Sequence, residues 1–414
     1  MNVLLVSQYF HPEPFLVNDL VRGLIERGHQ VTVLTGMPNY PEGRRYPGYG
    51  WFRPARETFA GASVLRVPIV TRGRGQGMRL IINYASFVLS ASLLGWLRAR
   101  GRHDAVLVFE PSPITVGLPA LWLARRWRAP VLLWVQDLWP DTLAAVGQGR
   151  LVRAIGSGIA RFVHNRCAAL LTQSMAFEQP LRAQGVAAQR IVYLPNWAEA
   201  HHLEAAPARA EGDPLARWKG FRIVFAGTLG TAQSFETILD AAAQLGVNAG
   251  VQWLILGDGS MRGWIETQIA TRDLGECVFL LGRQPESSMP AYFAAADALL
   301  VSLRPAPVFA MTVPRKVQSY LAAGRPIVAA LDGAGAQVIE QAAAGRCVPA
   351  GDAAALAAAV RELSRCSPQQ RAQMGERARA YYLANFDRAV LLDRLEQRLN
   401  QTVSEYDASD GSRR

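Results

Sequence analysis

The feature that most constrains the fold is an alternation of short apolar runs with helical segments, which occurs twice along the chain. Residues 2–8 form an apolar run, residues 15–27 place apolar side chains three and four positions apart and stop at Gly28, and residues 30–35 form a second apolar run. A strand, a helix and a strand within so short a stretch predict a βαβ unit with a right-handed crossover, and therefore a parallel sheet.

The alternation continues to residue 198, gives way to a polar, alanine-rich stretch, and restarts at residue 221. We therefore predict an α/β fold with two doubly wound domains that face each other across a cleft, where ligand pockets commonly form. The expected boundaries are a first domain at 1–198, a linker at 199–220, a second domain at 221–385, a last helix at 386–404 and a disordered tail at 405–414.

The charge is unevenly distributed. The chain of 414 residues has a formal net charge of +11, and residues 1–200, with 22 arginines and 11 acidic residues, carry all of it. Such a basic half attracts nucleic acid, anionic lipid headgroups or a phosphorylated substrate. No aromatic-interleaved basic strand or recognition-helix pattern supports nucleic acid.

The four cysteines are far apart and form no pattern with zinc spacing, so neither a disulfide framework nor a structural metal is indicated. The opening residues lack a charged leader and are typical of a first strand. We expect no signal peptide, and a cytoplasmic location.

Residues 80–97 are almost wholly apolar and about as long as a minimal membrane span. Asn83 and several serines interrupt the stretch, and βαβ units flank it on both sides. A transmembrane helix and a helix with one face at a membrane interface both stay open, and the flanking units favour a buried helix. Arginines on both sides of it suit anionic lipid.

Residues 302–320 contain the strongest local signal for a ligand. An expected strand leads into a loop with prolines, and a helix is expected to begin at Pro314. Arg304, Arg315 and Lys316 then surround a helix N-terminus, where free N–H groups and the helix dipole favour an anion. The alternative is a solvated basic loop beside a core helix.

Several longer motifs connect these elements. The first half contains Y-F-x-P-E-P at 9–14, R-G-H-Q-V-T-V-L-T-G-x-P-N-Y-P at 27–41, W-V-Q-D-L-W-P-D at 134–141 and L-P-N-W at 194–197. The second half contains F-A-G-T-L-G-x-A-Q at 225–233, G-D-G at 257–259, P-R-K-V-Q-S-Y-L-A-A-G-R-P-I-V at 314–328 and V-P-A-G-D at 348–352. With these motifs the chain resembles glycosyltransferase family 4, whose GT-B fold has two Rossmann-like domains. It looks closest to bacterial N-acetyl-L-fucosaminyl transferases of O-antigen and capsule assembly.

The resemblance implies roles for particular residues. The second domain is expected to bind the donor, a UDP-sugar, through Gly227, Thr228, Gln233, Asp258, Arg283, Arg304, Pro314, Arg315, Lys316 and Ser319. The first domain is expected to bind the acceptor through Phe15, Asn39, Tyr40, Glu110 and Trp139, with His11, Glu13, Asp137 and Asp141 as catalytic candidates. The last helix is expected to cross back onto the first domain, and no cofactor or metal is expected.

Three positions depart from the family pattern. Many members carry glutamates where this chain has Met311 and Ser319, and a basic residue where it has Thr231. A serine forms fewer hydrogen bonds than a carboxylate, so it cannot clamp two hydroxyl groups. We therefore expect Arg304, Arg315 and Lys316 to make the main contacts with the diphosphate.

The chain contains no D-x-D motif, which is typical of donors held by a metal. Arginine and lysine at a helix N-terminus stabilise a departing diphosphate without one. The resemblance implies retention of configuration. Because no carboxylate can be assigned as a nucleophile, we favour front-face transfer, with Asp137 or Asp141 as an alternative general base.

The leading hypothesis is a hexosyltransferase-type enzyme in cell-surface polysaccharide assembly, at the inner face of the bacterial membrane. It would move a sugar, such as an N-acetylated deoxyhexosamine, to a polyprenyl-diphosphate-linked or saccharide acceptor. Two alternatives stay open: a cytosolic UDP-sugar epimerase of the same fold, and a non-catalytic anion- or carbohydrate-binding protein.

Overall fold

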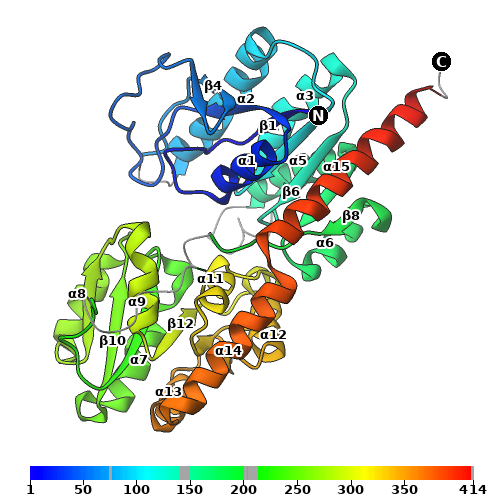
Figure 1. Cartoon of the computed structure of the whole chain (residues 1–414). Helices are drawn as coiled ribbons and strands as arrows, with labels where there is room; N and C mark the ends of the chain where they lie inside the picture. The colour runs from blue at the N-terminus through cyan, green and yellow to red at the C-terminus, as the bar shows by residue number, and fades with distance from the viewer. Residues whose placement is uncertain (74–76, 140–149, 200–202, 204–212, 412–414) are drawn as a thin grey trace. The chain divides into compact units, whose positions relative to one another are not determined.

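The computed structural model describes residues 1–73, 77–139, 150–199, 203 and 213–411 (Figure 1). The chain divides into two compact units. The first comprises Met1–Pro195 and Ala389–Arg414, and the second comprises Asn196–Arg388. The predicted fold class, two doubly wound α/β domains, is confirmed.

The first unit is built on one sheet with the strand order β3-β4-β2-β1-β5-β6-β7-β8. All neighbouring strands are parallel except β3 and β4. The central strand β1 is flanked on both sides and buries Val3, Leu4 and Leu5 completely. The strands are β1 (Asn2–Val6), β2 (Gln30–Gly36), β3 (Arg56–Phe59), β4 (Ala62–Val67), β5 (Ala105–Glu110), β6 (Val131–Val135), β7 (Ala169–Thr172) and β8 (Ile191–Tyr193).

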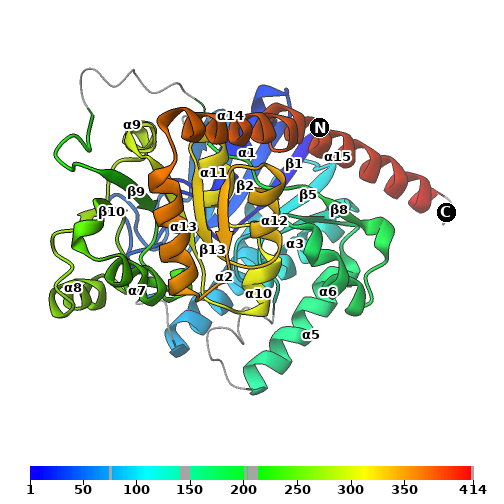
Figure 2. The ribbon, with the colours of Figure 1, turned by 90° about the horizontal axis from the view of Figure 1, so that it is seen from below.

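Helices cover both faces of this sheet, as right-handed crossovers require. On one face lie α1 (Leu16–Glu26) and α15 (Arg388–Gly411). On the other lie α2 (Gly77–Arg98), α3 (Gly117–Trp127), α5 (Arg150–Arg166) and α6 (Glu178–Ala183) (Figure 2).

The last helix returns to the first unit, as expected. Arg27 forms an ion pair of 2.6 Å with Asp393, and Nε2 of His29 lies 3.1 Å from Oε1 of Glu396. Leu391, Leu392, Leu395 and Leu399 are fully buried. The helix continues to Gly411, so the expectation of a disordered segment from residue 405 is wrong for residues 405–411.

The prediction that residues 80–97 form a buried helix is wrong. Among the described residues, α2 is the one helix whose length and apolar composition suit a membrane span, yet it packs against β2, β4 and α3. It buries only a narrow stripe of four residues: Asn83, Phe87, Ala91 and Gly95. Most of its large apolar side chains are exposed.

The second unit has an all-parallel sheet with the order β11-β10-β9-β12-β13-β14. Its strands are β9 (Phe221–Ala226), β10 (Val251–Leu256), β11 (Val278–Gly282), β12 (Ala298–Ser302), β13 (Ile327–Ala330) and β14 (Gly345–Val348). Alternate residues of β9 enter two separate apolar cores: Val224 enters one, and Ile223 and Phe225 enter the other.

Eight helices cover the two faces of this sheet among the described residues. One core holds side chains of α7 (Phe235–Leu245), α8 (Arg262–Thr271) and α13 (Ala353–Arg365). The other holds side chains of α9 (Met289–Ala295), α11 (Arg315–Ala323), α12 (Ala334–Gln341) and α14 (Pro368–Asn385), with α10 (Pro307–Met311) beside it.

The expected linker at 199–220 is shorter in the structure. Leu215 is fully buried and Trp218 is 9% exposed, and both belong to the core of the second unit. Arg222 joins this segment to the sheet through an ion pair of 2.8 Å with Asp213. Residues 200–202 and 204–212 lie outside the described part of the chain.

Candidate active site

Three loops meet at the carboxyl edge of the second sheet, where ligands of parallel sheets bind. The backbone N–H of Arg304, after β12, donates to the carbonyl of Ala232, 2.9 Å away. Nζ of Lys316, in the first turn of α11, donates to Oε1 of Gln233 at 2.8 Å. Leu229 donates to the carbonyl of Asp258 at 3.0 Å. The structure therefore brings together residues that are more than 80 positions apart in the sequence.

Glycines permit this close approach. A Cβ added to Gly227, whose φ is +143°, would lie 2.6 Å from Cε of Lys316. A Cβ added to Gly257, whose φ is +136°, would lie 1.8 Å from the carbonyl oxygen of Gly227. At Gly257 a backbone carbonyl leaves no room for a side chain, and at Gly227 a side chain would displace Lys316. Both positions also need a backbone conformation that glycine adopts at low cost.

Lys316 is the least compensated cation of this region. Its ammonium lies 3.5 Å from the centroid of the Phe225 ring, and burial lowers its pKa well below the usual value. Within the described part of the chain, no carboxylate forms an ion pair with it. A half-buried cation that faces a ring and an amide gains much from an anionic ligand, since a nearby negative charge offsets its lost hydration.

The other expected donor residues differ in their surroundings. Arg315 forms an ion pair of 3.0 Å with Glu199, so its charge is already balanced. Oδ1 of Asp258 accepts a hydrogen bond from the N–H of Gly259. Pro314 is the N-cap of α11 rather than its first residue, and offers no capping side chain. Thr228, Arg283 and Arg304 are exposed, and Ser319 is half-buried one turn after Arg315.

Tyr320 is a positioning residue that the sequence did not single out. Its hydroxyl accepts a hydrogen bond of 3.0 Å from the N–H of Ala226, the last residue of β9, and its ring packs edge-on against Phe293. It thereby fixes the start of the loop that carries Gly227. A tyrosine within a helix gives no sequence signal for this contact, because the partner lies 94 residues away.

In the first unit, Glu13, an expected catalytic residue, connects two loops through hydrogen bonds. Its Oε1 accepts hydrogen bonds from the N–H groups of Asn39 at 2.8 Å and Tyr40 at 2.7 Å, and its Oε2 accepts one from Phe10 at 3.1 Å. The residue is 1% exposed. The carboxylate therefore joins the loops that follow β1 and β2, and a reacting group has no access to it.

The expected acceptor residues Phe15 and Tyr40 form an aromatic cluster with Tyr9. The ring centroids of Tyr9 and Phe15 are 5.2 Å apart, and those of Phe15 and Tyr40 are 5.0 Å apart. The guanidinium of Arg72 lies 4.8 Å from the centroid of the Tyr40 ring. The backbone N–H of Arg72 donates a hydrogen bond to Oδ1 of Asn39. Arg72 is thus an additional candidate for this site, while Tyr9, which is only 3% exposed, supports the two rings from the protein interior.

His11 lies beside this cluster, near β3. Its ring centroid is 4.7 Å from that of Phe59, and its carbonyl accepts a hydrogen bond from the buried Arg66. Burial, and then the charge of Arg66, lower the pKa of His11, so its imidazole is neutral at pH 7. The side chain is exposed, and it stays a catalytic candidate.

Glu110 and Asp137 follow neighbouring strands of the first sheet. Glu110 ends β5 with 0% exposure, and its carboxyl oxygens have no hydrogen-bond partner among the described residues. Burial, and then the nearby Asp137, raise the pKa of Glu110 well above its usual value. Burial raises the pKa of Asp137, two residues past β6, to about 7. The raised pKa of Glu110 favours its neutral form, while the pKa of Asp137 lies in the range that suits a general base.

Trp139 is 8% exposed and packs edge-on against Tyr84, with the ring centroids 6.3 Å apart. Its indole N–H has no hydrogen-bond partner within the described ranges. Asp141, the fourth catalytic candidate, lies outside the described residues.

Both units of the chain match known protein families. Residues 16–197 match the model of the glycosyl transferase 4-like domain, and residues 220–365 match that of the glycosyl transferases group 1. The chain belongs to glycosyltransferase family 4.

Curated relatives of this glycosyltransferase come from bacteria. The putative colanic acid biosynthesis glycosyl transferase WcaI of Escherichia coli K12 is 25% identical over 315 residues, which cover 74% of this chain and 76% of WcaI. The amylovoran biosynthesis glycosyltransferase AmsK of Erwinia amylovora is 29% identical over 197 residues, which are 47% of each chain.

The crystal structure of HepE from Anabaena in complex with UDP and glucose shares the fold with a TM-score of 0.71 at 16% identity. The match covers 97% of this chain and all of HepE. The GT-B fold and the glycosyltransferase class expected from the sequence are confirmed. The specific likeness to fucosaminyl transferases stays a prediction.

The crowding at Gly257 of the glycosyltransferase gives a testable prediction. We expect Gly257→Ala to lower the free energy of unfolding by about 1–3 kcal/mol, because its Cβ meets a backbone carbonyl that cannot move alone. Gly263→Ala, in α8, is the matched control: its Cβ would meet no atom within 4 Å, and we expect no loss of stability. Denaturant unfolding of both variants measures this, and equal stability would contradict it.

We expect the contribution of Glu13 to the stability of the glycosyltransferase to depend on pH. Burial raises the pKa of Glu13 to about 7, although three N–H donors act in the opposite direction. The folded-state pKa exceeds the unfolded-state value, so the stabilisation is complete below about pH 4.5 and is lost as the pH rises to 7. Relative to Glu13→Gln, which does not titrate, wild-type stability should fall by about 3 kcal/mol across this range. A rise would show that the hydrogen bonds outweigh burial.

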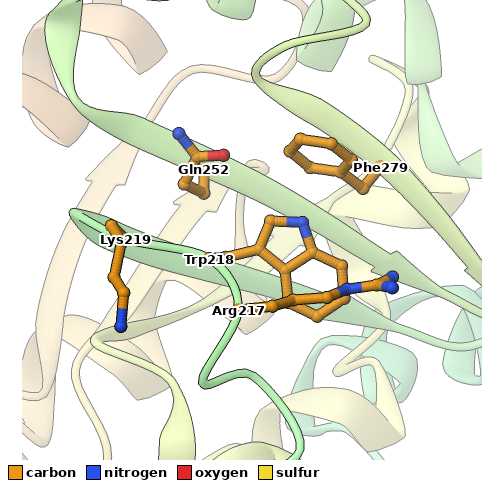
Figure 3. Close-up of a pocket in the computed structure, with 5 residues that line it drawn as sticks. All are labelled: Arg217, Trp218, Lys219, Gln252 and Phe279. Carbon is orange, nitrogen blue, oxygen red and sulfur yellow. The ribbon is translucent and has the colours of Figure 1, made fainter.

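The second unit of the glycosyltransferase also has an open hollow of about 580 Å³ (Figure 3). Arg217 lies 3.8 Å above the Trp218 ring, and Phe279 packs against that ring at 5.6 Å. Gln252 and Phe279 stand near the amino ends of β10 and β11, so the hollow lies at the sheet edge opposite Lys316. None of the expected donor residues lines it.

Proposed function

We propose that this enzyme transfers a sugar from a UDP-sugar to a lipid-diphosphate-linked or saccharide acceptor in cell-surface polysaccharide assembly. The half-buried charge of Lys316, which has no carboxylate partner among the described residues and lies at the carboxyl edge of the second sheet, carries the proposal. The likeness to HepE, whose crystal structure contains UDP and glucose, supports a UDP-linked donor. The names of WcaI and AmsK support polysaccharide biosynthesis.

The diphosphate of the donor would bind where Lys316 and the first turn of α11 present positive charge. As the bond between sugar and diphosphate breaks, negative charge grows on the leaving oxygen, and Lys316 stabilises it more strongly than in the ground state. The glycine backbone at 227 and 257 allows the sugar and the phosphates to approach the protein closely.

The acceptor would bind to the first unit, near the aromatic cluster of Tyr9, Phe15 and Tyr40. Aromatic faces suit the apolar side of a sugar ring, and Arg72 suits an acceptor phosphate. The proposed transfer retains the configuration and needs no metal. The acceptor proton leaves either to the departing phosphate or to Asp137.

The proposed location is the cytoplasm, at the inner face of the bacterial cell membrane. The basic first half would bind anionic lipid there. Because the chain belongs to a glycosyltransferase family, we favour transfer over the two alternatives, an epimerase and a non-catalytic binding protein.

A thermal-shift screen of nucleotide sugars tests the proposal. UDP and UDP-linked sugars, including UDP-N-acetyl-L-fucosamine, UDP-N-acetylglucosamine and UDP-glucose, are compared with the matching GDP and ADP compounds. A ligand at 100 times its Kd adds about 2.7 kcal/mol to stability, and we expect this from UDP compounds alone. Stabilisation by GDP or ADP compounds but not by UDP would overturn the donor proposal.

A further inference from the structure

We propose that the outer surface of α2, α3 and α5, hereafter the α2/α3/α5 face, docks on an anionic lipid bilayer. The inference deepens the membrane part of the proposed function and rests on it. It goes beyond the basic character of the first half, because it identifies one face of one sheet and the side chains that would enter the lipid.

The outward surface of α2 is apolar, unlike that of an ordinary surface helix. Met78, Ile82, Leu89, Leu93 and Leu97 are 67%, 46%, 72%, 66% and 65% exposed. Their spacing of four and seven residues places them on one side of the helix. The inward side holds Asn83, Phe87, Ala91 and Gly95, which include a polar residue and two small ones. The exposed side of α2 is therefore more apolar than the side that packs on the protein, the reverse of an ordinary surface helix.

The protein itself holds α2 in this orientation. Oδ1 of Asn83 accepts a hydrogen bond of 2.7 Å from Nε2 of Gln8, and Nδ2 of Asn83 donates to the carbonyl of Val70. A Cβ added to Gly95 would lie 2.8 Å from Cδ2 of Leu34, so a larger residue on the inward side would have to displace that buried side chain. The helix cannot turn its leucines inward without breaking these contacts.

The neighbouring helices extend the apolar surface and add aromatic groups. Trp122 of α3 is 46% exposed, and its ring centroid lies 5.3 Å from that of Trp96 at the end of α2. The guanidinium of Arg126 lies 5.3 Å from the Trp96 ring. On α5, Phe162 is 40% exposed beneath Arg166. Tryptophan and arginine together suit the boundary between lipid tails and headgroups, where an apolar body and a polar tip meet different surroundings.

The charge of this face matches anionic headgroups. The sequences of α2, α3 and α5 contain no aspartate or glutamate. They contain eight arginines: Arg79, Arg98, Arg125, Arg126, Arg150, Arg153, Arg161 and Arg166. The helices on the opposite face of the sheet, α1 and α15, mix acidic and basic residues. The α2/α3/α5 face and the helices α1 and α15, which Figure 2 shows on either side of the strands, therefore differ in charge as well as in hydropathy.

A bilayer is the occupant that suits both properties. A second copy of the chain would bring a like-charged face against this one, at an electrostatic cost. Nucleic acid would pair with the arginines but would leave the leucines of α2 without an apolar partner. Anionic lipid supplies negative headgroups for the arginines and hydrocarbon for the leucines and tryptophans.

Vesicle sedimentation with the full chain tests the proposal. Wild type is expected to bind phosphatidylglycerol-containing vesicles at low salt and to bind pure phosphatidylcholine vesicles at least tenfold more weakly. Leu89→Glu combined with Leu93→Glu should lower binding to the anionic vesicles at least tenfold. Leu383→Glu, at a position 47% exposed on α14 of the second unit, is the matched control and should bind as wild type does. A second variant combines Arg125→Glu with Arg161→Glu. It should also bind the anionic vesicles more weakly, because it reverses two positive charges and leaves the exposed leucines in place.

Further measurements separate this inference from the proposed function. Circular dichroism checks the fold, and stabilisation by UDP should be equal in wild type and in all variants. Equal vesicle binding by wild type and the Leu89/Leu93 variant would overturn the docking face, as would a concentration-dependent dimer that this variant abolishes. Loss of UDP stabilisation in wild type would instead overturn the proposed donor while leaving the membrane result intact.

Discussion

Lys316→Met is expected to lower kcat by about 10²- to 10³-fold, the effect of removing one preorganised group that stabilises charge in the transition state. The substitution keeps most of the side-chain volume and removes the ammonium that lies over Phe225 and bonds to Gln233. This charge has no carboxylate partner among the described residues, so the departing diphosphate would be its principal counter-ion. The loss corresponds to about 3–4 kcal/mol of transition-state stabilisation.

The chain offers a matched control for this change, because its only other lysine is Lys219. Lys219 lines the hollow at the opposite edge of the same sheet, and Lys219→Met should leave kcat unchanged. Steady-state kinetics with a saturating UDP-sugar measure both variants. Because burial lowers the pKa of Lys316, affinity for UDP should also fall as the pH rises toward that value, and only in proteins that retain Lys316. Wild-type kcat in Lys316→Met would refute the diphosphate assignment.

If Asp137 is the general base, Asp137→Asn is expected to lower kcat by about 10²- to 10⁴-fold, the usual contribution of such a group. Burial raises the pKa of Asp137 to about 7, so the wild-type rate should rise with pH through 7 and then level off as the carboxylate forms. The residual rate of the variant should not depend on pH in this range. The test is a pH–rate profile of both proteins over about three pH units centred on that pKa, from about pH 5.5 to about pH 8.5.

Glu110→Gln is the control for Asp137. Burial and the nearby Asp137 raise the pKa of Glu110 well above its usual value and favour its neutral form, so an amide of the same shape should lower kcat less than Asp137→Asn does. If Asp137→Asn instead keeps both the rate and the pH profile of wild type, the acceptor proton leaves to the departing phosphate, as front-face transfer requires.

The fold could be predicted well because its signals are local. Strand and helix periods, glycines at helix ends and the break before residue 221 depend on near neighbours in the chain. The donor residues could be placed at one sheet edge because carboxyl ends of parallel strands always meet there. The hydrogen bond from Lys316 to Gln233 agrees with that placement.

The errors came from properties that depend on distant neighbours. The apolar stretch at 80–97 was expected to be buried, yet hydropathy does not say what covers a helix. Asn83 and Gly95 orient α2 through Gln8 and Leu34, which lie some 60–75 positions earlier. Glu13 resembled a catalytic carboxylate, yet its partners are the N–H groups of residues 26 and 27 positions later.

The two α/β units, the family and the residue types that follow each strand can all be predicted from the chain order. Which of these charges are already balanced depends on the tertiary structure. Arg315 and Lys316 are adjacent in the chain, but Arg315 faces Glu199 while Lys316 faces Phe225 and Gln233. The energy of a charge depends on its burial and on the sign of its neighbours in space, and the chain order encodes neither directly.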